Sequence, residues 1–135
     1  MEYLDSYAGR TVLITGGLGF IGSNLVDALL ADGHGVTVLD DLSSGYGENL
    51  AHLRGREGFR FLEGDVRDEA LLAQAARGQE AVFHLAALKH VPQAEYNPFE
   101  AVKTNVVGTQ NVIEGAMAQG VSAVLYASSD KAASP

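Results

Sequence analysis

Cysteine is absent from the 135 residues of this chain, which excludes a disulfide framework and a thiolate metal site. Basic residues are scarce as well: nine Lys and Arg stand against 17 Asp and Glu, and the net charge is -8. Because an acidic chain without a basic cluster is repelled by a phosphate backbone, we expect no nucleic-acid partner. The four histidines form no metal-ligand pattern, so we expect no metal and interpret each as a surface or packing residue: His34, His52, His84 and His90.

Long apolar runs are missing too. No stretch approaches the roughly 18 residues that a membrane-spanning helix needs. The first ten residues, "MEYLDSYAGR", lack the basic segment and the apolar run of a signal peptide. We therefore expect a cytoplasmic protein with no membrane partner. Hydrophobic residues nevertheless make up 47% of the chain, which is enough for the buried core of a single domain over residues 1–135.

Strand-like and helix-like segments alternate along the chain. We expect strands, each a nearly continuous apolar run, at 11–15, 35–40, 59–65, 80–87 and 121–129. We expect helices at 20–33, at 68–78 and, as one long helix, at 97–120, and a loop followed by a short helix within 41–55. Such alternation indicates a parallel sheet with helices on both faces. Right-handed crossovers then predict a doubly wound α/β fold with strand order 3-2-1-4-5.

The segment "TGGLGFIG", which links the first expected strand to the first turn of the first expected helix, holds four glycines. Gly16 permits a tight turn, Gly19 lets a pyrophosphate come close to the backbone, and Gly22 lets the helix pack tightly on the strand. The free N–H groups and the positive dipole end of the helix then hold the phosphate charge. The position between a strand and a helix favours a dinucleotide site over the alternative, a glycine-rich turn with no ligand.

An acidic residue follows at the position that a dinucleotide site requires. Asp40 ends the second expected strand, 18 residues after Gly22, where a carboxylate accepts hydrogen bonds from the adenine ribose. Asp41 follows it, and no Arg or Lys occurs between Arg10 and Arg54 to neutralise a 2′-phosphate. The sequence therefore favours NAD over NADP. The alternative is that Asp40 only caps the end of the strand.

Two further features fall on the same edge of the predicted sheet. Asp65 closes the third strand and is able to accept from the adenine amino group; the alternative is a turn-forming Asp before the helix. Small residues, Ala86 and Ala87, close the fourth strand and leave room for a cofactor. All these residues follow the carboxyl ends of strands, where open α/β sheets bind ligands.

Five motifs together resemble those of one enzyme family: "TGGLGFIG", "DDLSSG", "GDVRD", "HLAALK" and "TNVVGTQNV". They are similar to the extended short-chain dehydrogenase/reductase family of nucleotide-sugar enzymes, which have a Rossmann fold. The stretch from 84 to 135 most resembles the polysaccharide-biosynthesis branch, typified by UDP-N-acetylglucosamine 4,6-dehydratases. "VLDDLSSGYGENL" also resembles UDP-glucose 4-epimerases.

The resemblance implies a set of cofactor contacts. They are Gly16, Gly19, Phe20 and Ile21 at the pyrophosphate, Asp40, Asp41, Ser43, Ser44 and Gly45 around the ribose, Asp65 and Val66 beside the adenine, and Ala86, Ala87 and Lys89 toward the nicotinamide. It also implies that Asn105 stabilises the active-site backbone from a helix. The alternative for Asn105 is an ordinary polar residue on a helix face.

The resemblance further implies a catalytic group after the fifth strand, formed by Ser129, Asp130 and Lys131. In a dehydratase, oxidation at sugar C4 gives a ketone and makes the C5 proton acidic. A Lys with a lowered pKa could remove that proton, and an Asp could protonate the leaving C6 hydroxyl. The alternative is that "SDK" is a polar chain end in solvent.

One family feature is missing from this sequence. The proton-transfer Tyr of the family has a Lys four residues later, and none of the five tyrosines here has one. We therefore expect the cofactor-binding half of a longer enzyme, without the substrate domain, which binds NAD but turns over UDP-sugars weakly or not at all. Two other hypotheses stay open: an NAD-binding module or sensor without catalysis, and a remnant that binds nothing.

The last expected strand also predicts an oligomer. "VSAVLYA", residues 121–127, is apolar and has no successor strand to pair with. Exposed strand edges and uncovered apolar surfaces invite association with another chain. We expect a homodimer or a larger assembly.

Overall fold

The computed structural model describes residues 11–42, 47–86 and 97–127. Its strands are β1 (Thr11–Thr15), β2 (Gly35–Asp40), β3 (Phe59–Glu63), β4 (Ala81–His84) and β5 (Ala123–Tyr126). Its helices are α2 (Phe20–Ala31), the 3-10 helix η1 (Gly47–Leu53), α3 (Glu69–Ala76), α5 (Pro98–Val102), the π-helix η2 (Lys103–Val107) and α6 (Gly108–Ala118).

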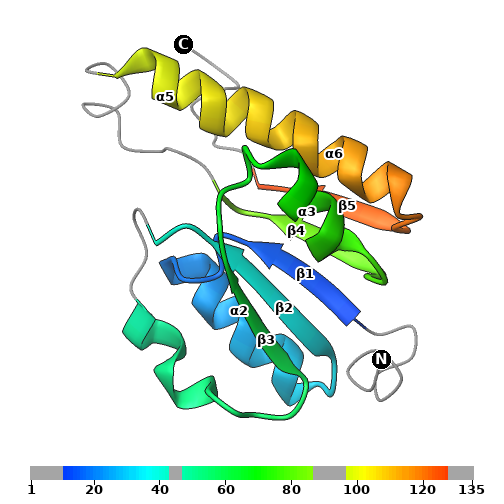
Figure 1. Cartoon of the computed structure of the whole chain (residues 1–135). Coiled ribbons are helices and arrows are strands. Elements are labelled where there is room, and N and C mark those ends of the chain that lie inside the picture. Colours follow the sequence, from blue (N-terminus) through cyan, green and yellow to red (C-terminus); the bar gives the residue numbers. More distant parts are fainter. Residues whose placement is uncertain (1–10, 43–46, 87–96, 128–135) are drawn as a thin grey trace.

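The five strands form one parallel sheet in the order β3-β2-β1-β4-β5 (Figure 1). The predicted doubly wound fold and strand order are therefore confirmed. β1 and β2 have the predicted bounds, and every residue of both strands is buried. This burial explains why their sequences are nearly continuous apolar runs, because a central parallel strand is covered on both faces.

Two apolar layers cover the sheet. On one face, Val26 and Leu30 of α2 and Leu50 and Leu53 of η1 pack on β1 and β2. On the other face, α3 and α6 lie side by side and bury a second cluster that includes Leu72. The sheet edge between these layers carries the carboxyl ends of all the strands, so ligand-binding residues are brought together there.

The prediction of one helix over 97–120 is wrong in its detail. The segment is helical, but α5 and α6 are separated by the π-helix η2, in which the Gly108 N–H donates to the Lys103 carbonyl, five residues earlier. Gly108 packs closely against the loop that follows β3. A Cβ added at Gly108 would lie 2.6 Å from Val66 Cγ2. Sequence periodicity does not encode this contact, and a π turn adds one residue without breaking the helix.

β5 lies at the edge of the sheet. It pairs with β4, and within the described residues no strand lies on its other side. All four of its residues are exposed, including Leu125 at 57%. No helix among the described residues is long and apolar enough to cross a bilayer.

Candidate functional site

The glycine turn between β1 and α2 has a geometry that glycine alone fits well. Gly16 has a φ of +77°, in the left-handed region, and its N–H donates to the Leu39 carbonyl at 2.9 Å. A Cβ at Gly16 would lie 2.8 Å from the Ala86 nitrogen. The turn is therefore pressed between the ends of β2 and β4, as the predicted tight turn requires.

Gly22 seats helix α2 on this turn. A Cβ at Gly22 would overlap the Gly16 carbonyl oxygen and lie 2.7 Å from Gly17 Cα. The tight packing predicted for Gly22 is present, although its contact is with the turn. Gly19 is the N-cap, where a Cβ would meet only the Gly16 oxygen at 3.6 Å. The close approach of a pyrophosphate at Gly19 stays a prediction.

The N-terminus of α2 is suited to an anion. The N-cap Gly19 makes no side-chain hydrogen bond to the first turn, and the first turn holds no acidic residue. The first amide groups of a helix have no intrahelical acceptor and lie at its positive dipole end. Phe20 and Ile21 are 83% and 59% exposed, so two large apolar side chains flank this terminus.

Asp40 joins the end of β2 to the glycine turn. Asp40 is only 8% exposed. Its Oδ2 accepts the Leu18 N–H at 3.1 Å, and its Oδ1 accepts the Leu42 N–H at 2.8 Å. A carboxylate has about four lone-pair sites, and these two bonds from the described residues take one on each oxygen. Asp40 therefore organises the turn, and its predicted contact with a ribose is compatible with these bonds. Asp41 lies beside it and is exposed.

Arg54 comes close to this part of the molecule through the fold. It lines an apolar cavity of about 160 Å³ together with Leu18 and Leu42, the two residues that donate to Asp40. The other lining residues are Gly47, Leu50, Phe59 and Phe61. Arg54 and Asp40 are far apart in the sequence. In the fold, Arg54 shares a cavity with the two residues that are hydrogen-bonded to Asp40.

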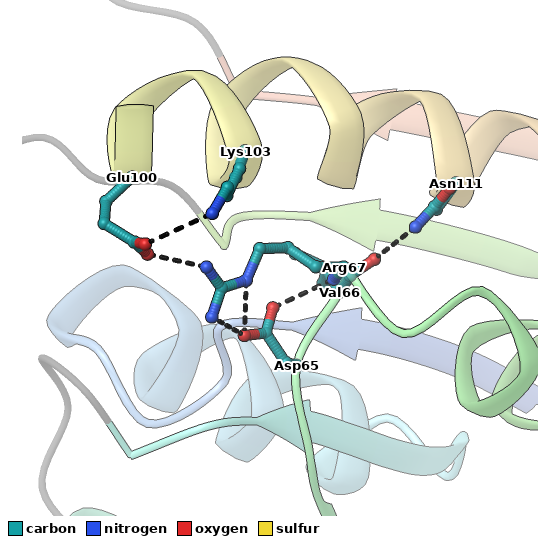
Figure 2. A network of polar contacts seen from close by, with 6 residues as sticks. All are labelled: Asp65, Val66, Arg67, Glu100, Lys103 and Asn111. Atoms are coloured by element: carbon teal, nitrogen blue, oxygen red, sulfur yellow. Dashed lines mark hydrogen bonds and ion pairs between the residues drawn. The ribbon is translucent and has the colours of Figure 1, made fainter. Parts of the chain in front are cut away.

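Asp65 forms a network of polar contacts that the sequence analysis missed (Figure 2). Its Oδ1 accepts the Arg67 N–H at 2.9 Å, and its Oδ2 accepts from the Arg67 guanidinium at 2.6 and 2.7 Å. Arg67 also contacts Glu100 of α5 at 2.6 Å, and Lys103 lies 3.7 Å from Glu100. The network ties the loop after β3 to the helix that leads into η2.

This network lowers the pKa of the Asp65 carboxyl. Burial raises its pKa, but the side-chain and backbone hydrogen bonds from Arg67 outweigh burial, and the pKa is lowered overall. The carboxylate is thus ionised at neutral pH. An ionised carboxylate accepts hydrogen bonds, which suits the predicted contact with an adenine amino group.

Val66 lies beside Asp65 but points into the core. Its residue is 4% exposed, and its carbonyl accepts the Asn111 side chain of α6 at 3.0 Å (Figure 2). The side chain packs under Gly108. Any contact of Val66 with an adenine would therefore come from its main chain.

The remaining predicted residues divide into two groups. Ala86 is half-buried against Gly16, and Asn105 is half-buried in η2, with its carbonyl accepting the Thr109 hydroxyl at 2.6 Å. The others lie outside the described residues: Ser43, Ser44, Gly45, Ala87, Lys89, Ser129, Asp130 and Lys131.

The glycine turn, Asp40, Asp65 and Ala86 thus meet at the carboxyl edge of the sheet. A helix N-terminus beside two carboxylates is suited to a ligand that carries both a diphosphate and hydroxyl or amino donors. No group of three or more His, Asp or Glu that could hold a metal ion occurs in the part of the chain that the structure describes.

Comparison with known proteins gives a family for this arrangement. A family model described as "Polysaccharide biosynthesis protein" matches residues 12–135. An uncharacterized membrane protein of Methanocaldococcus jannaschii is 48% identical over 130 residues, which cover 96% of this chain and 39% of that protein.

Two relatives have names that refer to sugar-nucleotide reactions. A UDP-glucose 4-epimerase of Mycolicibacterium smegmatis is 47% identical, with 87% of this chain and 38% of the relative covered. A UDP-N-acetylglucosamine 4,6-dehydratase (inverting) of Campylobacter jejuni is 38% identical, with 96% and 39% covered. The chain therefore spans about two fifths of the length of the curated relatives it matches.

A solved structure supports the same grouping. The dTDP-glucose 4,6-dehydratase DesIV of Streptomyces venezuelae, with NAD and TYD bound, superposes with a TM-score of 0.79. It is 40% identical, and the match covers 84% of this chain and 38% of that one.

Proposed function

The chain belongs to the polysaccharide biosynthesis protein family, and on that premise we propose that it forms the dinucleotide-binding part of an enzyme that modifies a nucleotide sugar. The observation that carries the proposal is the link from the glycine turn to Asp40, through the Leu18 N–H at 3.1 Å. This link joins a helix N-terminus to a carboxylate at the end of the second strand, where a dinucleotide-binding fold holds the adenine ribose, and so supports the proposal.

The residues fit a dinucleotide. Gly16 and Gly22 allow the compact turn, because a Cβ at either would overlap the backbone, while at Gly19 a Cβ would meet only the Gly16 oxygen at 3.6 Å. The first-turn amides of α2 would hold the pyrophosphate, and Asp40 would accept from the ribose hydroxyls. Asp65 would accept from the adenine amino group.

We favour NAD over NADP as the cofactor. A 2′-phosphate would sit next to Asp40 and Asp41, and like charges at close range repel each other. Arg54 lines the neighbouring cavity and is the described cation best placed to offset this repulsion. Calorimetric titration with NAD and with NADP tests the choice. We expect NAD to bind more tightly than NADP. Equal affinities would contradict the preference for NAD.

The relatives' reactions support a reaction class for the proposal. When bound, NAD takes a hydride from the substrate and returns it later in the same cycle. The proposal is a nucleotide-sugar 4,6-dehydratase, with a 4-epimerase as the alternative. In the dehydratase, Lys131 would remove the C5 proton of the 4-keto sugar, and Asp130 would protonate the leaving C6 hydroxyl, with Ser129 beside them.

On its own, the 135-residue chain would bind NAD without turning over substrate efficiently. Support comes from the tyrosines, none of which has a Lys four residues later. Incubation with UDP-N-acetylglucosamine and NAD, followed by chromatography of the sugar nucleotides, tests this proposal. Fast formation of a 4-keto-6-deoxy sugar by the isolated chain would overturn it. No absorbance of reduced cofactor when UDP-sugars are added to the NAD-bound chain would favour a sensor.

A homodimer is also part of the proposal. β5 has an exposed edge, and apolar residues are exposed on the long helical segment, including Phe99 at 77%, Val106 at 61% and Met117 at 75%. Burial of such a surface against a second copy would stabilise both chains. Sedimentation equilibrium at micromolar concentration tests it, and a monomer would contradict it.

A cytoplasmic location completes the proposal. It rests on the absence of cysteine from the sequence. Fractionation of cells that express a tagged chain tests the location. Recovery in the membrane fraction after a high-salt wash would overturn it.

A further inference from the structure

His84 is a buried histidine that links two parts of the candidate site. It ends β4, pairs in register with Thr15 of β1, and is 1% exposed. Its ring lies 5.6 Å from the ring of Tyr126 in β5, tilted by 32°. Nδ1 is 2.7 Å from the Thr15 hydroxyl, and Nε2 is 3.0 Å from the Thr109 hydroxyl at the start of α6.

The Thr15 hydroxyl has one possible role toward this ring. Its oxygen accepts the Ala86 N–H at 3.3 Å and lies 3.1 Å from the Leu85 nitrogen, whose N–H also donates to the Thr15 carbonyl at 3.0 Å. These contacts use the lone pairs of the hydroxyl oxygen and leave its proton for the histidine. This arrangement favours donation from Thr15 to an unprotonated His84 Nδ1.

The Thr109 hydroxyl requires the same tautomer from the other side. It donates its proton to the Asn105 carbonyl at 2.6 Å, so it can only accept from His84 Nε2. Nε2 therefore carries the ring proton. Burial lowers the pKa of His84 to about 4, so the ring is neutral at neutral pH, in agreement with this pattern.

We propose that His84, as the neutral Nε2–H tautomer, is a positioning residue that holds the glycine turn and the Asn105 segment in one hydrogen-bonded chain. At one end, Thr15 directly precedes Gly16 and fixes the Leu85 and Ala86 amides against it. At the other end, Thr109 holds the carbonyl of Asn105 in the π-helix. The inference rests on the proposed function, in which the glycine turn binds the dinucleotide.

The alternative is a histidine that only fills space in the core. The two roles differ because a packing residue needs its volume but not the placement of its proton. A positioning residue requires an acceptor toward Thr15, which holds the glycine turn, and a donor toward Thr109, which holds the Asn105 segment. Two substitutions separate these requirements in this chain.

His84→Asn can place an acceptor near the Nδ1 position but does not reach Thr109, and His84→Gln can place a donor near the Nε2 position but loses the acceptor for Thr15. We expect His84→Asn to bind NAD within about threefold of wild type, and His84→Gln to bind about tenfold more weakly, since one hydrogen bond at the turn is lost. Calorimetric titration measures both affinities, and thermal unfolding shows that both variants are folded. Equal NAD affinities in two folded variants would overturn the proposal.

A spectroscopic measurement tests the chain without any cofactor. Long-range ¹⁵N–¹H correlation spectra of the wild-type protein should show His84 with Nε2 protonated and Nδ1 unprotonated. Backbone amide shifts should change at Leu85 and Ala86 in His84→Gln, and around Asn105 in His84→Asn. The Nδ1–H tautomer, or identical shift changes in both variants, would contradict the proposal. Failure of the wild-type chain to bind NAD would refute the proposed function and leave these spectra to decide the role of His84.

Discussion

The backbone N–H of Leu18 donates to Asp40 Oδ2 at 3.1 Å, which joins the glycine turn to the end of the second strand. The second oxygen of the same carboxylate holds the Leu42 N–H. Leu42 has a φ of +66°, which is uncommon for a residue with a branched side chain. One buried carboxylate thus holds backbone groups on both sides, Leu18 in the glycine turn and Leu42 after β2.

Replacement of Asp40 tests this arrangement. Asp40→Asn keeps the size but presents an amide N–H₂ to one of the two backbone donors, so we expect a loss of about 1–3 kcal/mol in the free energy of unfolding. We also expect NAD affinity to fall at least about tenfold, because the ribose loses a charged acceptor. Urea denaturation and calorimetry measure the two effects. The control is Asp32→Asn, an exposed residue at the far end of α2; matching behaviour of the two variants would contradict the account.

Gly22 gives a second prediction. In Gly22→Ala the new Cβ overlaps the Gly16 carbonyl oxygen, so α2 must move away from the turn, at a cost of about 1–3 kcal/mol in stability. NAD binding should be lost in the variant that remains folded. Gly47→Ala is the matched control, because a Cβ there has no neighbour within 4 Å. Wild-type stability in Gly22→Ala would show that the turn is not packed as described.

The buried His84 predicts how stability depends on pH. Its pKa falls from 6.5 to about 4 on folding, so the folded state resists protonation and the unfolded state does not. The stability that it contributes is complete above pH 6.5, is lost progressively as the pH falls, and is fully lost near pH 4. Between pH 7 and pH 5 we expect a loss of about 2 kcal/mol. Urea denaturation of wild type and His84→Gln at both pH values measures it, and an equal loss in both proteins would rule out His84 as the source.

The network around Arg67 predicts a change in the titration of Asp65. In Arg67→Ala the hydrogen bonds that lower the Asp65 pKa are gone, while burial, which raises it, remains. We therefore expect this pKa to rise, as measured by NMR titration of the carboxyl carbon. The free energy of unfolding should change by only about 0.5–1 kcal/mol, since these side chains are partly exposed. Arg77→Ala, at the exposed end of α3, is the control, and an unchanged Asp65 pKa in Arg67→Ala would contradict the network.

The central part of the fold could be predicted from the sequence because burial leaves a clear pattern. The segments 11–15 and 35–40 are covered on both faces, and their bounds are recovered from their apolar runs. The strand order follows from right-handed crossovers. The helix expected at 20–33 is present as α2 over Phe20–Ala31, whereas its buried residues, Gly22, Val26 and Leu30, are known only from the structure.

The contacts that refine the site could not be predicted in the same way. Arg67 and Glu100 are 33 positions apart, and no local pattern pairs them. The π-helix depends on the packing of Gly108 against Val66, which requires three-dimensional positions. His84 was interpreted as a surface or packing residue, and its burial fits the second reading. A polar residue at the end of a buried strand indicates a hydrogen bond, because buried polar groups are paired. The partner, Thr15 on the neighbouring strand, is seen only in the structure.

A crystal structure of the chain with NAD tests the central claim most directly. The account predicts the pyrophosphate at the N-terminus of α2, over Gly19, and the adenine ribose within hydrogen-bond distance of Asp40. A dinucleotide bound elsewhere, or a glycine turn left empty in crystals grown with saturating NAD, would contradict it.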